Sequence, residues 1–419
     1  MARSSRPAAA LAMVLALAGC SGGAGVPDEV TPSRSPVPDV TLPQGVSYEE
    51  FVRKLDGRAD SHVQVLTVRP DARVKVAGVH GSALAHAETV RAMAGTAGAP
   101  AAVNTSYFDI SSGKNYGGYD GDPLGLYTER GRMLSEATNG RTALLLGERE
   151  GRLDARIDEV TTEAQVISDD GSRRELDGVN RVPGRILGCG GVGGDRLAVS
   201  EVPMEEPYGG LCTDDAEIVA FTEEWGDDTP PGSPDSTEAV LDRDGWVLEV
   251  RKPAGGPVPE NGSTLYATGS GVDWLRSHAR TGSRVTRSVR MNDAVGLPVA
   301  GRVDTAVGGR YRLLKDGVSA LGDAAASTRR APRTVVGVTP DGTLLLVTID
   351  GRSPGVDAGA TLGEAAGLLA SLGAKDGIGL DGGGSTTMVV GGEVRNHPRE
   401  ADGRATERPV ANALALFAR

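Results

Sequence analysis

Short apolar runs, separated by glycine, proline and aspartate turns, make up most of the chain after about residue 46. Residues 62–68 and 73–79 alternate between apolar and polar side chains, which is the period of a half-buried strand. The Pro70-Asp71 turn between them predicts a β-hairpin. Continuous apolar runs at 101–103 and 344–349 predict strands that are buried on both faces.

Two segments show helical spacing instead. Residues 362–372 place apolar side chains on one helical face, and Gly373 follows as a typical helix stop. Residues 88–94 predict a second, shorter helix. Strands interspersed with isolated helices predict an α+β fold: a mixed β-sheet domain with a few helices packed against it. We place this domain at 46–419, with a less regular insert near 190–300.

The composition and charge of the chain mainly indicate which partners are not expected. The chain has 419 residues, 60 of them glycine, and a formal net charge of −12. So many glycines indicate tight turns and close backbone approaches. Because no block of lysines and arginines is present, we expect no nucleic-acid partner. These features leave the oligomeric state open.

The first 45 residues predict export. Arg3 and Arg6 precede an apolar run at 8–18, which is too short to span a bilayer as a mature helix. The run ends at Leu17-Ala18-Gly19-Cys20, which resembles the lipobox of bacterial lipoproteins, whose cysteine becomes the lipidated first residue. An ordinary secretory signal is the alternative. We predict a signal peptide at 1–20, lipidation of Cys20 and a flexible tether at 21–45.

Such a protein is expected on the outer face of the cell membrane, held there by its lipid anchor, or released outside the cell. Export also places the two remaining cysteines, Cys189 and Cys212, in an oxidising compartment, where we expect them to form a disulfide. They are far apart and have no clustered histidines, so they do not predict a zinc site.

The most distinctive polar motif follows the apolar segment 378–380. It consists of Asp381, Gly382, Gly383, Gly384, Ser385 and Thr386. A carboxylate at a strand end is well placed to act as an acid, base or nucleophile. Glycines let a ligand approach closely, and their N–H groups can bind an anion. Taken alone, however, the motif also fits a hairpin turn.

Further motifs surround this one in order. They occupy 331–337, 348–352 and 360–366 before Asp381, and 396–398 and 407–413 after it. Together they resemble the phosphodiester glycosidase family, most strongly over 300–419 and more weakly at 102–109 and 121–126. The family usually has two glycines after the residue equivalent to Asn104, whereas this chain has Thr105 and Ser106, which add side chains there.

The resemblance implies an exported hydrolase that cleaves a sugar-1-phosphodiester bond in a cell-envelope or environmental glycoconjugate. Its substrate would then be a carbohydrate phosphodiester. The alternative is a non-catalytic carbohydrate- or cell-wall-binding protein on the same fold. Hydrolysis requires a carboxylate beside the oxocarbenium-like sugar, a cationic or N–H partner for the phosphate, and polar groups for the sugar hydroxyls.

The chain offers residues for each role. The catalytic candidates are Asp381, Asp350 and Glu364, and the substrate-binding candidates are Asn104, Arg333, Gly382, Gly383, Gly384, Ser385, Thr386, Asn396 and Arg408. Asp350 and Asp381 each follow an apolar strand, so their carboxylates converge if those strands are neighbours.

Each candidate also has a structural alternative. The alternatives are a turn for Asp350, a solvated helix face for Glu364, ion pairs for the arginines and loop bracing for the asparagines, including Asn412. The hydroxyls of Ser385 and Thr386 can equally cap a turn.

We expect no cofactor and no metal. The five histidines are scattered, and His62, His80 and His86 lack metal-ligand spacing, so we expect them to be structural or exposed. A divalent ion between Asp350 and Asp381 remains an alternative, although nothing resembles a dedicated calcium loop.

Overall fold

The computed structural model describes residues 41–55, 59–109, 119–138, 141–184, 186–187, 196–197, 211–322 and 327–419. The signal peptide, Cys20, the tether up to residue 40, and Cys189 lie outside the described residues, as does the side chain of Cys212. Lipidation and the disulfide therefore stay predictions. Within the described ranges, no helix has the length and apolar character needed to cross a membrane.

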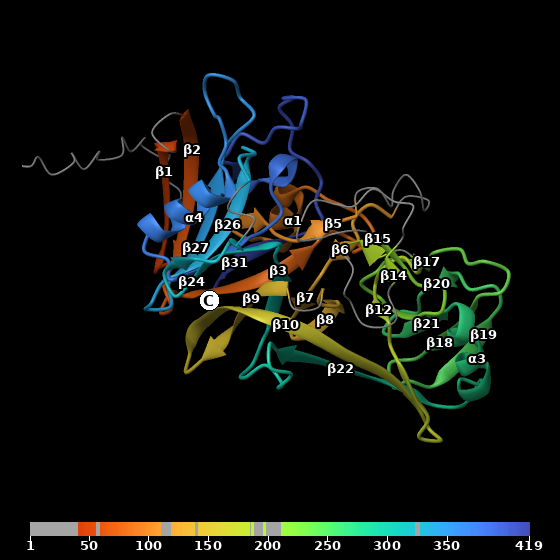
Figure 1. The fold of residues 1–419 in the computed structure, drawn as a ribbon. Coiled ribbons are helices and arrows are strands. Elements are labelled where there is room, and N and C mark those ends of the chain that lie inside the picture. The colour runs from red at the N-terminus through yellow and green to blue at the C-terminus, as the bar shows by residue number, and fades with distance from the viewer. Residues whose placement is uncertain are drawn as a thin grey trace, which may run out of the picture.

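Two antiparallel sheets form the body of the molecule (Figure 1). The first has the order β1-β2-β27-β26-β28-β24-β25. Its strands are β1 (Val46–Leu55), β2 (Ala59–Val68), β24 (Tyr311–Lys315), β25 (Val318–Ser319), β26 (Arg333–Val338), β27 (Leu344–Ile349) and β28 (Asp376–Gly379). The second has the order β3-β31-β4-β29-β30. Its strands are β3 (Val74–His80), β4 (Ala101–Asn104), β29 (Met388–Val390), β30 (Glu393–Val394) and β31 (Asn412–Ala418).

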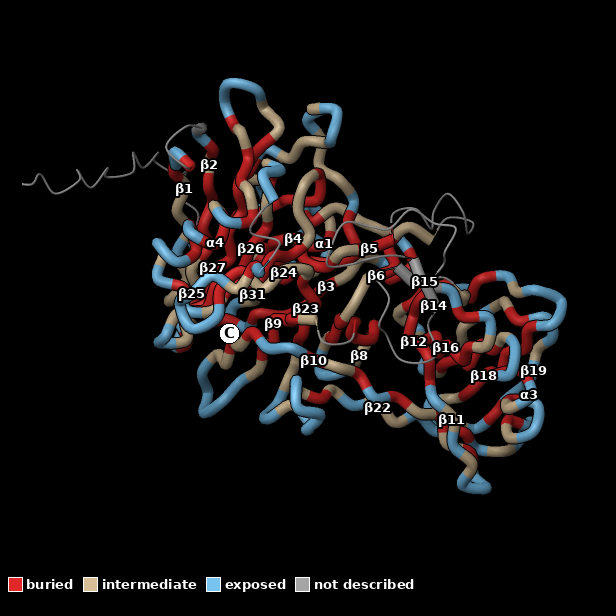
Figure 2. The backbone as a smooth tube through the Cα atoms, viewed as in Figure 1, coloured by how far each residue is buried: buried red, intermediate tan, exposed pale blue. Residues whose placement is uncertain are grey.

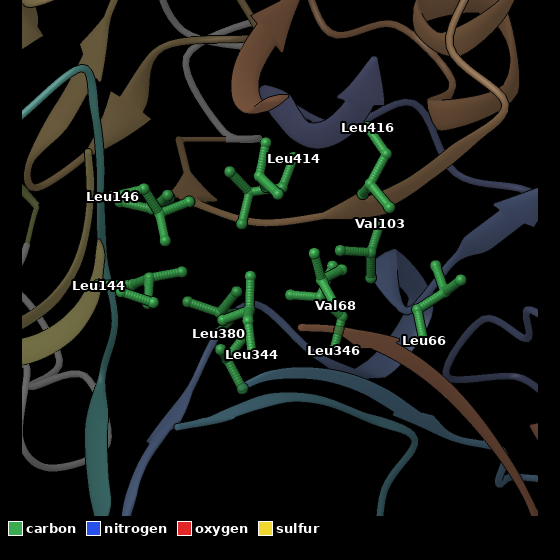
Figure 3. Close-up of a cluster of buried hydrophobic side chains, with 14 of the residues drawn as sticks. Leu66, Val68, Val103, Leu144, Leu146, Leu344, Leu346, Leu380, Leu414 and Leu416 are labelled. Carbon is green, nitrogen blue, oxygen red and sulfur yellow. The ribbon is translucent and has the colours of Figure 1, made fainter. Parts of the chain in front are cut away.

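A hydrophobic core fills the space between these sheets (Figure 3). Leu66 and Leu346 from the first sheet lie opposite Val103 and Leu416 from the second, and all four are buried. Each fully buried aliphatic side chain of this size contributes about 1.5–3 kcal/mol. Burial of these side chains therefore provides most of the free energy that holds the two sheets together.

Helices cover the outer faces of both sheets. Helix α4 (Leu362–Ser371) packs Leu362, Ala365 and Leu369 into a cluster with the first sheet. Helix α1 (Val90–Ala97) packs Val90 and Met93 into a cluster with the second. The body thus has helix, sheet, sheet and helix layers, which agrees with the predicted α+β fold of a sheet domain with a few packed helices.

A third sheet extends this body with the order β11-β10-β9-β23-β7-β8, and β22 also pairs with β10. Its strands are β7 (Tyr127–Glu129), β8 (Arg132–Ser135), β9 (Arg141–Arg149), β10 (Arg152–Ser168), β11 (Arg173–Glu175), β22 (Val285–Asp293) and β23 (Thr305–Gly308). The long strands β10 and β22 run side by side from the body towards a smaller lobe (Figure 1).

The smaller lobe consists of a sheet with the order β12-β16-β21-β18-β19 and of helix α3 (Gly269–His278). The strands of this sheet are β12 (Gly178–Val179), β16 (Ile218–Thr222), β18 (Thr237–Leu241), β19 (Val247–Arg251) and β21 (Ser263–Ala267). The remaining short strands are β5 (Tyr107–Phe108), β6 (Pro123–Leu124), β13 (Ile186–Leu187), β14 (Arg196–Leu197), β15 (Leu211–Thr213), β17 (Asp228–Thr229) and β20 (Gly256–Pro257). In Figure 2, buried segments concentrate in the strands of the body and the lobe, and exposed segments lie mainly in their connections.

The structure corrects one local prediction. The Pro70-Asp71 turn closes as expected, with the Ala72 amide donating to the Arg69 carbonyl at 3.0 Å, but β2 and β3 lie in different sheets and form no hairpin. Val68 before the turn and Val74 after it both point into the core between the two sheets. The turn therefore forms a corner of the sandwich, because burying both apolar faces outweighs pairing the two strands with each other.

Candidate functional site

Asp381 lies at one edge of the first sheet, just after β28. Strands β27 and β28 are both antiparallel to β26, which lies between them, so the two are parallel to each other and end at the same edge. Asp350 directly follows β27, and Arg333 begins β26 at the same edge. The two carboxylates therefore share an edge, although their strands are separated by β26.

Asp381 is half-buried and has positive charges nearby. It accepts hydrogen bonds from the Ser385 hydroxyl and the Gly382 amide, and it feels the charges of Arg408 and Arg310. Burial raises the pKa of Asp381 to about 6, although these four groups favour the ionised form. A carboxyl group that titrates near neutral pH is suited to acid–base or nucleophilic chemistry.

Arg408 is held in place by Glu400. Arg408 Nε donates to Glu400 Oε1 at 2.8 Å, and Arg408 Nη2 donates to the other oxygen of the same carboxylate. Arg408 Nη1 lies 3.4 Å from Ser385 Oγ, and Ser385 is fully buried. Ser385 thus connects Arg408 with Asp381. Because the ion pair is bidentate, it fixes the orientation of the guanidinium as well as its position.

Neighbouring groups approach the three glycines closely. A Cβ on Gly384 would lie 2.5 Å from Arg408 Nη2, and a Cβ on Gly383 would lie 2.9 Å from Arg352 Nη2. Gly383 also has a φ of +62°, which favours glycine. A Cβ on Gly382 would lie 3.0 Å from the Pro332 carbonyl oxygen. The glycine run therefore lets two guanidinium groups and one backbone segment approach the loop closely.

Arg352 adds a cation without a matching carboxylate. Its Nη1 donates to the Arg399 carbonyl at 3.0 Å, and no ion pair to Arg352 occurs within the described parts of the chain. Burial and the neighbouring charge of Arg408 lower the pKa of Arg352. Arg352 and Arg408 lie beside two carboxylates, Glu400 and Asp381, and their guanidinium groups are suited to form charge-assisted hydrogen bonds with a phosphate.

Arg310 approaches Asp381 from the segment before β24. Its guanidinium lies 5.6 Å from the centre of the Tyr107 ring and 5.7 Å from that of Tyr311, which is cation–π distance. Arg310, Arg352 and Glu400 were not among the predicted site residues. Arg352 lies within the motif at 348–352, so its place in a matched motif was the available signal.

Asn104 braces the loop that carries Asp381. Asn104 Oδ1 accepts from Thr334 Oγ1 at 2.7 Å and from the Thr387 amide at 3.0 Å, while Asn104 Nδ2 donates to the Asp381 carbonyl at 2.7 Å. These contacts join both sheets to both ends of the glycine loop. Of the two roles considered for Asn104, the structure thus shows loop bracing.

The other two asparagines make similar contacts. Asn412 Oδ1 accepts from Thr105 Oγ1 at 2.6 Å and from the Ser106 amide at 3.0 Å. Asn396 Oδ1 accepts from the Met388 amide at 2.8 Å, and Asn396 Nδ2 donates to the Thr386 carbonyl at 2.8 Å. Asn412 therefore organises the segment after β4, and Asn396 organises the segment before β29.

Several buried polar atoms around this loop have no partner. Ser106 Oγ, Thr386 Oγ1, Thr387 Oγ1 and Asn412 Nδ2 make no hydrogen bond within the described parts of the chain. Leaving such a group buried and unpaired costs about 1–3 kcal/mol. They lie on three segments around Asp381, at residue 106, at 386–387 and at the start of β31, and all four are closed off from solvent.

The structure places two predicted site residues in structural contacts. Glu364 Oε2 accepts from the Thr361 amide at 2.8 Å in a capping box of α4, and Arg330 donates to Glu364 Oε1. Arg333 donates to the carbonyls of Ala360 at 2.9 Å and Arg329 at 3.0 Å. We therefore leave Glu364 out of the catalytic group that we propose below; Thr361-x-x-Glu364 is the sequence signature of a capping box.

Both carboxylate oxygens of Asp350 also accept hydrogen bonds within the structure. It is 1% exposed and accepts from the His397 amide at 2.8 Å, His397 Nδ1 at 2.9 Å, Gln64 Nε2 at 3.2 Å and Asn396 Nδ2 at 3.3 Å. The structure thus places it among polar side chains of its own, a cluster considered separately below. A cavity of about 520 Å³ lies elsewhere, lined by Arg132, Asp242 and Arg284 among others, and includes none of the residues around Asp381.

Comparison with known proteins supports the predicted family over part of the chain. Residues 235–417 match the model of the phosphodiester glycosidase family. The matched segment contains Asp381, Arg408, Arg352 and Arg310, but not Asn104. The resemblance that the motifs predicted is thus confirmed over this segment. No curated protein matches the chain.

Several solved structures are similar. A candidate exported protein of Burkholderia pseudomallei is 28% identical with a TM-score of 0.73, over 86% of this chain and 74% of that one. A hypothetical protein from Synechocystis shares the fold at 20% identity and a TM-score of 0.65, over 91% and 64% of the two chains. The zebrafish N-acetylglucosamine-1-phosphodiester alpha-N-acetylglucosaminidase catalytic domain, auto-inhibited by its pro-peptide, is 15% identical with a TM-score of 0.42, over 90% and 84%.

Proposed function

We propose that this protein is a hydrolase that cleaves a sugar-1-phosphodiester bond in a cell-envelope or environmental glycoconjugate. The observation that carries the proposal is the half-buried Asp381, with a pKa raised to about 6, beside Arg408 and Arg310. The family match over the same segment supports this class of reaction.

In this reaction the phosphate is held by the arginines. Arg408, oriented by Glu400, and Arg352, which has no carboxylate partner within the described residues, bind the diester oxygens. Their charge stabilises the phosphate as it leaves with the electron pair of the broken C1–O bond. Because a phosphate monoester is a weakly basic leaving group, no strong proton donor is needed there.

Asp381 acts on the sugar. Above its pKa it is a carboxylate, which attacks the anomeric carbon or stabilises the oxocarbenium-like transition state. Water then adds its hydroxyl to the anomeric carbon and loses a proton to the departing phosphate or to solvent, which leaves Asp381 as a free carboxylate. The unpartnered hydroxyls of Ser106, Thr386 and Thr387 are buried, so they would meet the sugar hydroxyls only if the glycine loop moves when substrate binds. Thr105 and Ser106, where the family usually has glycines, add side chains next to Asn104, and we expect them to influence which sugar is accepted.

We further propose that the reaction takes place outside the cell, with the protein anchored to the membrane through Cys20. The lipobox-like segment and the similarity to the candidate exported protein of Burkholderia pseudomallei support this location.

The direct test is sugar release from a panel of nucleotide-sugars and teichoic-acid-like diesters. Asp381→Asn keeps the size of the side chain and removes its charge, so we expect turnover to fall by about a thousandfold or more. Asp235→Asn, at an exposed position in the smaller lobe, is the matched control and should act like wild type. If no diester is hydrolysed while glycans are still retained in a pull-down, the alternative of a non-catalytic carbohydrate-binding protein is supported instead.

A further inference from the structure

Four side chains from three parts of the chain meet near the edge where β27 ends. His62 lies on β2, Asp350 and Asp357 lie in the loop between β27 and α4, and His397 follows β30. One nitrogen or carboxylate oxygen from each lies within 4.8 Å of the corresponding atoms of the other three. Strand pairing builds half of the cluster, because the Asp350 amide donates to the His62 carbonyl at 2.9 Å across the β2–β27 ladder.

The four atoms have the spacing of a small coordination shell. His62 Nδ1 lies 2.7 Å from Asp357 Oδ1, and His397 Nδ1 lies 2.9 Å from Asp350 Oδ2. The donor atoms of a tetrahedral zinc site with bonds of about 2.0–2.1 Å lie about 3.3 Å apart. To admit an ion in place of the shared protons, the atoms of each His–Asp pair must move apart by about half an ångström, while the two pairs, whose atoms lie within 4.8 Å of one another, adjust towards the same spacing.

Burial and charge also favour a cation here. Asp350 is 1% exposed and Asp357 is 3% exposed. No lysine or arginine in the described ranges forms an ion pair with either carboxylate; the histidines are their partners. Two buried carboxylates this close need compensating positive charge. The His397 side chain is 58% exposed, which gives an ion a path from solvent.

We propose that His62, Asp350, Asp357 and His397 bind one divalent transition-metal ion, with zinc fitting the donor set best. Two imidazole nitrogens and two carboxylate oxygens suit zinc or its neighbours, whereas calcium and magnesium prefer oxygen alone. The surrounding contacts support the ligands. Gln64 donates to Asp350 at 3.2 Å and itself accepts from Thr348 Oγ1 at 2.8 Å, and the His62 amide donates to Asp357 at 2.8 Å.

The ion has a structural route to the glycine loop. Asn396 Nδ2 donates both to Asp350 Oδ1 at 3.3 Å and to the Thr386 carbonyl at 2.8 Å. A metal that fixes Asp350 thereby fixes Asn396 and the end of the loop that begins at Asp381. The ion is then a positioning element, and its presence does not depend on which substrate the protein hydrolyses.

Metal titration of the tag-free full chain after chelator treatment tests this proposal. We expect one zinc ion per chain and an unfolding temperature raised by several degrees at saturating zinc. His62→Ala and His397→Ala should each weaken binding about a hundredfold or more. His278→Ala is the matched control because His278 pairs with a single carboxylate, Asp170, at 3.0 Å and lies outside the cluster. Its binding should equal that of wild type.

Two results would overturn the proposal: no saturable binding by the wild-type chain, or equal affinity in the double His62→Ala/His397→Ala variant. Circular dichroism shows whether the variants fold. If they do not, cobalt(II) added to the wild-type chain decides, because nitrogen and oxygen ligation in a four-coordinate site gives visible absorption bands. If the spectrum equals that of cobalt(II) in buffer alone, the proposed metal site is rejected. Sugar release is scored separately, so failure here leaves the proposed hydrolase standing.

Discussion

Asn104 donates a 2.7 Å hydrogen bond from its side chain to the backbone carbonyl of Asp381, a residue 277 positions later in the chain. The Asp381 amide in turn donates to the Thr105 carbonyl at 2.9 Å. The position of the Asp381 carboxylate is therefore set by the opposite sheet as well as by its own turn. Because Asn104 also pairs with Thr334 and Thr387, one side chain holds the first sheet, the second sheet and the glycine loop together.

Replacing Asn104 should consequently cost stability as well as activity. Asn104→Ala leaves Thr334 Oγ1 and the Thr387 amide unpaired in the interior, for an expected loss of about 2–4 kcal/mol of unfolding free energy. Urea unfolding measures this loss. If Asn104 only contacted sugar, the variant would keep wild-type stability and bind substrate more weakly.

The pH dependence of turnover follows from the pKa of Asp381, which burial raises to about 6. Since the ionised carboxylate is the active form, kcat/KM should be half-maximal near pH 6 and should fall about tenfold per pH unit below it. A profile measured between pH 4.5 and 8 on a substrate that does not titrate there checks this. Activity that falls as the pH rises through 6 would instead make Asp381 a proton donor.

The same raised pKa predicts that Asp381→Asn is more stable than wild type at neutral pH. The folded-state pKa of about 6 lies above the ordinary value of 3.8, so the folded protein binds this proton more tightly than the unfolded chain does. Stability from this group is therefore lost as the pH rises from about 4 to 6. We expect a gain on the order of 1–3 kcal/mol at pH 7.5, narrowing at pH 4.5. Equal stability at both pH values would mean that Arg408 and Arg310 fully offset the burial.

The glycine loop offers a steric test. Gly384→Ala puts a Cβ 2.5 Å from Arg408 Nη2 and 2.8 Å from Glu400 Oε2, so this ion pair must move. We expect kcat/KM to fall by about tenfold or more. Gly367→Ala on the exposed side of α4 is the control, since its Cβ meets nothing within 4 Å. It should leave activity unchanged and stabilise the helix by up to about 1 kcal/mol.

Replacing Glu364 distinguishes a helix-capping role of this residue from a catalytic one. Glu364→Ala removes the capping box of α4 and the contact with Arg330, which should lower unfolding free energy by about 1 kcal/mol. The folded variant should keep its turnover, as measured by sugar release below its unfolding temperature. A thousandfold loss of kcat at unchanged stability would return Glu364 to the catalytic group.

Local patterns predicted much of the fold. The apolar run at 344–349 is β27, the run at 101–103 lies within β4, and the helix predicted at 362–372 is α4. The helix predicted at 88–94 forms slightly later, as α1. Pairing was harder to predict, because turn chemistry at Pro70-Asp71 specifies a reversal but not the sheet that the next strand joins.

The candidate site, too, was only partly predictable from the sequence. Asp381 and Arg408 stand in recognisable motifs and lie together around Ser385. Arg310 and Glu400 were missed because their roles depend on which side chains meet across the glycine run. The residues of the proposed metal site show no recognised ligand spacing, since they come from β2, from the loop after β27 and from the segment after β30.

Strand β31, which ends at Ala418, lies between β3 and β4 in its sheet and so receives hydrogen bonds on both sides. β31 is thus an interior strand whose two partners come from segments hundreds of residues earlier in the chain. Asn412 takes its place beneath the glycine loop only when these distant segments have met. Because contacts between residues so far apart in sequence form slowly, we expect the candidate site to form late in folding.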